Sequence, residues 1–165
     1  MRVYLPTTLP ALRRLLDTGT LGDPPLPGYA VTPGLREWYA EGDDEELEYT
    51  ALTLAAQASL RLLDADPDAP PRRAVLAADI ADRAVLAAPG VGRGAVHVGE
   101  PVGLSLVRSV HVDDPAAEDD VRAAVAAVLE ADLGSEDAVF VMEQADGHEL
   151  QWYASQELGP LLELS

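Results

Sequence analysis

The sequence predicts one α+β domain, built on a mixed, mostly antiparallel sheet of short strands with about five helices. The 165 residues have the length of a single domain, and no repeat or linker divides them. Helical patterns concentrate in the first third and at the C-terminus. Short apolar runs separated by glycine and proline fill the middle, and this segregation is typical of α+β folds rather than doubly wound parallel sheets.

The first elements are a strand and a capped helix. Residues 3–5 form an apolar run that predicts a buried strand. Thr8 is placed to cap a helix over residues 9–18, because leucines recur there at helical spacing. Gly19 follows at the position of a left-handed C-terminal cap. Residues 20–28 contain three prolines and two glycines, which predicts a loop.

The next segment predicts a strand and two helices. A strand is expected at residues 29–31, and Thr32 then caps a short helix that ends near Gly42. Either Asp43 or Asp44 caps a long helix, whose first turn is rich in acids that favour the positive end of the helix dipole. Its apolar positions are broad enough to pack on a sheet and on other helices. They are Leu47, Ala51, Leu52, Leu54, Ala56, Ala58, Leu60, Leu62 and Leu63.

Strands dominate the middle of the chain. Residues 64–72 are rich in proline and aspartate, and predict a mobile loop. Strands are expected after it at residues 73–80, 84–87, 95–98 and 109–112. Residues 101–107 fit either a helical turn or another short strand.

Helices return in the last third. Asp114-Pro115 starts a helix that ends near residues 131–134. Its inward positions are predicted to be Val121, Val125, Val128 and Leu129. Residues 139–142 suggest a strand, with the start of a helix as the alternative. Asp146 opens a last helix that Gly159-Pro160 stops.

Composition excludes several classes of function. The chain has no cysteine, so it has neither disulfides nor thiolate ligands or nucleophiles. The net charge of −18 repels phosphate backbones and anionic lipid, which excludes nucleic-acid and membrane partners and favours a basic one. No apolar run resembles a signal peptide or a membrane span, so we expect a cytoplasmic protein. The absence of lysine and asparagine, beside abundant alanine and arginine, is typical of a GC-rich genome.

The segment that most resembles a catalytic or metal-binding site is His111-Val112-Asp113-Asp114. On a strand, His111 and Asp113 share one face and could form a proton-transfer pair or bind a metal. The competing interpretation is that the two aspartates end the strand and cap the next helix. His148-Glu149 could join them only if the fold brought the histidines together. No metal-binding pattern is evident, and we expect no metal or cofactor.

Two further segments have ordinary explanations. Gly90-Val91-Gly92-Arg93-Gly94 could cradle a phosphate on its backbone, but it lacks both the P-loop ending and the dinucleotide spacing. A flexible hairpin connection is the simpler interpretation. Residues 41–48 hold six acids, whose spacing does not match a calcium loop and is typical of a solvated helix start.

Several segments together resemble a small family of uncharacterised actinobacterial proteins, over nearly the whole chain. The segments are Arg2-Val3-Tyr4-Leu5-Pro6, Tyr29-Ala30-Val31-Thr32-Pro33, Asp44-Glu45-Glu46-Leu47-Glu48-Tyr49, Val110-His111-Val112-Asp113-Asp114 and Gly147-His148-Glu149-Leu150-Gln151-Trp152-Tyr153. This resemblance implies a bacterial cytoplasmic setting and carries no activity to transfer.

The order of elements is also similar to the ADP-ribosyltransferase fold, whose families bind nicotinamide dinucleotide. That likeness implies an active centre in which Arg2, Tyr4 and Thr32 take part. Leu5 stands where the family commonly has histidine, and no Glu-x-Glu strand follows, so the implied centre is incomplete.

These observations favour a non-catalytic interaction protein whose partner is a protein with a basic surface. The alternative is a divergent ADP-ribosyltransferase-like enzyme or nucleotide-binding protein. If a catalytic site exists, its candidate residues are His111, Asp113, Tyr4 and Thr32.

Overall fold

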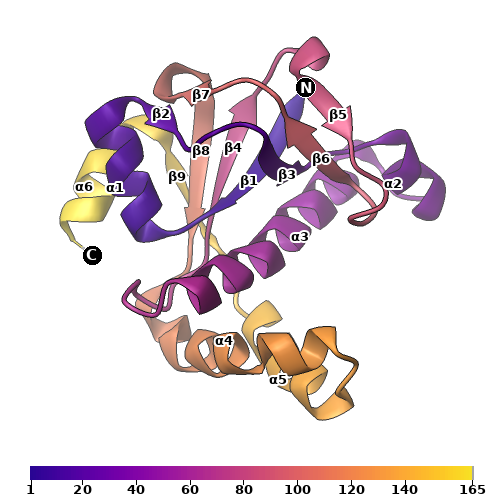
Figure 1. Cartoon of the computed structure of the whole chain (residues 1–165), viewed down its shortest axis with the longest axis vertical. Coiled ribbons are helices and arrows are strands. Elements are labelled where there is room, and N and C mark those ends of the chain that lie inside the picture. The colour runs from indigo at the N-terminus through magenta and orange to yellow at the C-terminus, as the bar shows by residue number, and fades with distance from the viewer. Residues whose placement is uncertain (165) are drawn as a thin grey trace.

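The computed structural model describes residues 1–164 (Figure 1). Within them, the chain forms a seven-stranded sheet, a separate two-stranded sheet and six α-helices. The strands are β1 (Arg2–Thr7), β2 (Thr20–Leu21), β3 (Leu26–Tyr29), β4 (Ala74–Asp79), β5 (Val85–Ala87), β6 (Ala95–Val98), β7 (Val102–Gly103), β8 (Val107–Val112) and β9 (Gln151–Ala154). The helices are α1 (Leu9–Thr18), α2 (Pro33–Trp38), α3 (Asp44–Ala65), α4 (Glu118–Asp132), α5 (Glu136–Asp146) and α6 (Leu158–Glu163).

The large sheet has the order β5-β6-β3-β1-β4-β8-β9, and every neighbouring pair is antiparallel. The first strand of the chain therefore lies at the centre. β1 pairs with β4 over its full length, from Arg2 opposite Asp79 to Thr7 opposite Ala74. The small sheet joins β2 to β7. The prediction of an α+β domain with a mostly antiparallel sheet is confirmed.

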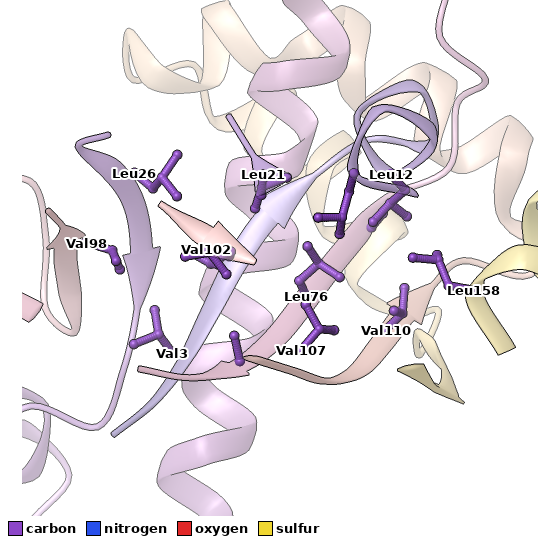
Figure 2. Packing of buried hydrophobic residues seen from close by; sticks show 14 of the residues in the cluster. Val3, Leu12, Leu21, Leu26, Leu76, Val98, Val102, Val107, Val110 and Leu158 are labelled. Carbon is purple, nitrogen blue, oxygen red and sulfur yellow. The ribbon is translucent and has the colours of Figure 1, made fainter. Parts of the chain in front are cut away.

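Alternation along the central strands divides the core between the two faces of the sheet. On one face, Val3, Leu5 and Leu76 pack with leucines of α1 and α6, and Figure 2 shows Leu12 and Leu158 meeting this face. On the other face, Tyr4, Val75 and Ala77 pack against the alanines of α3. The small side chains of Ala51, Ala55 and Ala56 let α3 lie close to the strands.

A hairpin of α4 and α5 covers the outer side of α3, away from the sheet (Figure 1). Leu60 and Leu63 of α3 pack there with Val121, Ala124 and Val128 of α4. α5 rests mainly on α4, with Ala145 buried in the same cluster. The hairpin is therefore held along the side that faces α3, and the rest of its surface is open.

The predicted caps of α1 and α3 are confirmed. The Thr8 hydroxyl accepts a hydrogen bond from the Ala11 amide, and Gly19 closes α1 with a φ of 80°. Asp43 caps α3 by accepting from the Glu46 amide at 2.8 Å. Residues 101–107 contain both predicted alternatives, a short strand and a helical turn.

In the first third of the chain, one predicted loop, one predicted strand and one helix end need correction. Residues 20–28 are not a plain loop, because they hold β2 and most of β3. The strand expected at residues 29–31 ends at Tyr29 instead. Pro27 fits within β3 because this strand pairs with β1 at a single position, Tyr29 opposite Tyr4. Gly28 fits because it lies so close to β1 that a side chain there would meet Val3. α2 ends at Trp38 rather than near Gly42.

In the C-terminal part, one alternative is resolved and the last helix was misplaced. Residues 139–142 are helical, which is the alternative to the expected strand, because the Ser135 cap and the acids of the first turn favour α5 over the strand propensity of Val-Phe-Val. No helix opens at Asp146, which ends α5, and the segment that follows forms β9 against β8. Gly159-Pro160 lies within the first turn of α6. Proline is tolerated there because the amide groups of the first turn have no acceptor within the helix.

Two buried faces also differ from the expected ones. In α3, Leu62 is exposed and Ser59 is buried, so the inward face is rotated from the predicted stripe. In α4, Val121 and Val128 are buried as predicted, but Leu129 is exposed.

Candidate functional site

Asp113 belongs to a buried ion pair. Its side chain is fully buried, and both carboxylate oxygens accept hydrogen bonds from the Arg73 guanidinium, at 2.8 Å each. The Arg73 amide donates a third bond to Asp113, and Arg73 Nη2 also donates to the His148 carbonyl. The pair thus ties β4 and β8 to the turn between α5 and β9. The helix-capping role expected for both aspartates holds only for Asp114, which accepts from the Ala116 amide.

His111 lies on β8, on the side of the sheet that faces α3, opposite Val75 of β4 and Trp152 of β9. Its Nε2 is 2.9 Å from the Ser109 hydroxyl, two residues earlier on the same face. Burial lowers the pKa of His111 to about 4, and the positive charge of Arg2 adds to this effect. The imidazole is therefore neutral at pH 7. It hydrogen-bonds to a hydroxyl rather than to the carboxylate of a proton-transfer pair.

Tyr4 lies on the same sheet face as His111, because Tyr4 is opposite Ala77 and Ala77 is opposite Ser109. Burial raises the pKa of Tyr4, and the nearby carboxylate of Glu48 raises it further. The phenol is consequently a poor acid in this fold. The structure brings Tyr4 and His111 onto one face and leaves Asp113 in its ion pair with Arg73.

Thr32 has a structural role. Its hydroxyl accepts a hydrogen bond from the Leu35 amide at 3.2 Å and caps α2. The fourth candidate residue is therefore engaged in holding the short helix that ends at Trp38.

The histidines are not gathered. The His148 ring is turned toward α4, with Nε2 2.7 Å from Asp120. In residues 1–164, no three histidine or acidic side chains are arranged to hold a metal ion. No helix among these residues has both the length and the apolar character needed to cross a bilayer.

The glycine-rich segment connects β5 to β6 and carries Arg93 to α2. The Gly94 carbonyl accepts from the Ala30 amide at 2.8 Å, and Gly94 has a φ of 78°, which favours glycine. This anchor holds the loop against the sheet. The Arg93 guanidinium carbon lies 3.3 Å from the centroid of the Trp38 ring, which is cation–π contact. A cavity of about 300 Å³ adjoins this pair, between α2, α3 and the loop.

A family model matches residues 1–162. The chain belongs to DUF6912, a family of unknown function. Comparison with curated proteins and with solved structures found no match. The resemblance to a family without an assigned activity is confirmed for this DUF6912 chain, while its likeness to ADP-ribosyltransferases stays a prediction.

Besides the cavity near Arg93, the end of the hairpin at which α4 turns into α5, here called its free end, is a surface of interest. Large apolar side chains lie exposed in the last turn of α4, in the turn and in the first half of α5. They are Leu129 (64% exposed), Leu133 (80%), Val139 (40%) and Phe140 (63%). This surface was not predicted, because Leu129 was expected in the core and residues 139–142 were expected to form a strand, with the start of a helix as the alternative.

The stack of Arg93 on Trp38 was also missed. The two residues are far apart in the sequence, and nothing local to either predicts the contact. The sequence offers one local indication: Arg93 lies between Gly92 and Gly94, so its charged side chain has no side chain beside it on the loop.

Proposed function

We propose that this protein acts without catalysis, by binding a basic segment of another protein at the free end of the α4–α5 hairpin. The observation that carries the proposal is the exposure of Leu129, Leu133 and Phe140 among acidic side chains. Exposed apolar groups of this size, rimmed by polar residues, mark interaction surfaces.

Charge defines the chemistry of the partner. Residues 118–146 carry nine acidic residues and a single arginine, Arg122. In the free half of the hairpin, several exposed carboxylates have no ion pair with any residue in the range 1–164. They are Glu130, Glu136, Asp137 and Glu143. A partner segment with lysine or arginine around apolar residues would complement both features, because the attraction steers it and apolar burial holds it.

The same charge disfavours a second copy of this chain as the occupant. Two copies would each bring a net charge of −18 and would place like-charged hairpins together. A cytoplasmic setting completes the proposal, because a chain without cysteine needs no oxidising compartment.

The test compares Phe140→Ser with Leu86→Ser, since Phe140 is 63% exposed on the hairpin and Leu86 is 67% exposed on β5. Proteins captured from lysate by the wild type are identified and purified, and their binding is measured by calorimetry at low and moderate salt. Burying one such side chain contributes about 1.5–3 kcal/mol, so Phe140→Ser should weaken Kd roughly 10- to 100-fold. Leu86→Ser should bind like the wild type, and the affinity should fall with salt.

Three results would count against the proposal. One is equal affinity of the purified partner for Phe140→Ser and the wild type. Another is a partner whose binding is insensitive to salt. The third is a concentration-dependent dimer, seen by sedimentation, that Phe140→Ser dissolves, because the occupant would then be a second copy. Circular dichroism checks that both variants fold.

A further inference from the structure

The cavity between α2, α3 and the β5–β6 loop differs in chemistry from four other cavities of the surface. Four other cavities are each lined by at least one aspartate or glutamate. This one is lined by two arginines and three aromatic residues, with no carboxylate. The lining residues that matter are Tyr29, Trp38, Tyr39, Gln57, Arg61 and Arg93. Such a lining is notable in a chain with 29 acidic residues and only 11 basic ones.

The two arginines differ in availability. Arg61 binds Asp132 of α4 through Nε and Nη2, at 3.1 and 2.7 Å, so its charge is already balanced. No carboxylate in residues 1–164 forms an ion pair with Arg93, whose guanidinium rests on Trp38. The guanidinium carbon lies 3.3 Å from the centroid of the Trp38 ring, and the guanidinium N–H groups make no hydrogen bond with any residue in the range 1–164. Those groups match the oxygens of a phosphate or carboxylate in a bidentate arrangement.

The aromatic walls define the rest of the ligand. Trp38 and Tyr39 are 57% and 44% exposed, so both rings are accessible to a ligand in the cavity. Tyr29 of β3 and Gln57 of α3 supply a further ring and an amide. A cavity of about 300 Å³ lies at the lower limit for small-molecule sites. It has room for one planar ring with a short charged arm.

We infer that this cavity binds a small anion carrying a planar aromatic ring, of the nucleoside monophosphate class. The ring stacks on the aromatic wall and the phosphate binds Arg93. Because Trp38 and the Gly94 anchor already hold Arg93, little side-chain freedom is lost on binding. The cavity is linked to the hairpin through the ion pair of Arg61 with Asp132, but its lining residues all lie outside the hairpin and the inference does not depend on the proposed protein partner.

The experiment measures the binding of adenosine monophosphate, adenosine and inorganic phosphate by calorimetry and by amide chemical shifts. The monophosphate should shift the amides of residues 90–94 and the Trp38 indole. Adenosine and phosphate should each bind at least tenfold more weakly, since each offers half of the recognised chemistry. Arg93→Ala should weaken the binding of the monophosphate at least tenfold.

Arg83→Ala is the matched control, because Arg83 is an exposed arginine paired with Glu100 outside the cavity. It should bind like the wild type. Trp38→Phe should retain more affinity than Trp38→Leu, since phenylalanine keeps a face for the guanidinium. The inference is overturned if the monophosphate shows no saturable binding, if Arg93→Ala binds it as well as the wild type, or if phosphate alone binds as tightly.

Discussion

Removing one partner of the Arg73–Asp113 ion pair is predicted to cost much of the stability of the fold. Asp113→Ala leaves a guanidinium that is only 2% exposed, with Asp146 at 3.7 Å as its remaining carboxylate. The three hydrogen bonds that Asp113 accepts from Arg73 are lost together. Breaking a buried pair from one side costs about 3–5 kcal/mol, because the remaining charge keeps its desolvation cost without its counter-charge.

That loss is large against the total. Domains are stable by about 5–15 kcal/mol, so Asp113→Ala removes a third or more of a typical value. For a chain of this length, each kcal/mol lowers Tm by about 2–4 °C, which predicts a fall of roughly 6–20 °C. Urea denaturation followed by circular dichroism gives the free energy of unfolding directly.

Asp119→Ala is the control for this prediction, because Asp119 pairs with Arg122 at the protein surface. Exposed pairs contribute about 0–1 kcal/mol, so this variant should unfold almost like the wild type. A double variant, Arg73→Met with Asp113→Leu, should recover most of the loss, since it leaves no charge buried. The reasoning is refuted if Asp113→Ala and Asp119→Ala lose the same small amount, because the buried pair would then be hydrated in solution.

Three further predictions concern the sheet. The pKa of His111 is about 4 in the fold and 6.5 when unfolded, so the unfolded chain takes up the proton first as pH falls. The contribution of the neutral His111 ring to the free energy of unfolding is complete above pH 6.5, and at most about 3 kcal/mol of it is lost as the pH falls toward 4. Urea denaturation at pH 7 and at pH 4.5 should therefore show a smaller loss of stability for His111→Gln than for the wild type. Gly28→Ala places a methyl 2.8 Å from a methyl of Val3 and should cost about 1–3 kcal/mol, whereas Gly90→Ala meets open space and should be neutral by thermal melting. Ser59→Ala removes a buried hydroxyl that bonds two backbone groups of the sheet, at 2.8 and 3.2 Å, and should cost about 1–3 kcal/mol in urea; unchanged stability would mean that water replaces it.

What could be predicted from the sequence was local. Caps lie within a few residues of the helices they begin or end, so spacing alone identified Thr8 and Gly19 and narrowed the cap of α3 to Asp43 or Asp44. The strand at residues 95–98 was also found with its observed bounds. Its two valines are buried on either side of the exposed His97, and no competing helical pattern overlaps them.

The errors arose where a distant partner decides the structure. Trp152 and Tyr153 suited a helix face as well as a strand, and pairing with β8 selects the strand. Pro27 argued for a loop, but pairing with β6 draws it into β3, opposite His97. The ion pair of Asp113 could not be predicted for the same reason, because its partner, Arg73, lies 40 residues away in the sequence.

The central place of β1 has a consequence for synthesis. β1 is synthesised before β4, and its long ladder with β4 cannot form until the more than sixty residues of chain between them have been made. Closing such a loop is slow compared with forming a helix. The apolar strand stays uncovered meanwhile. Chaperone protection of the nascent chain would matter most in this interval, and α1, which follows β1 immediately, is the earliest element able to shield it.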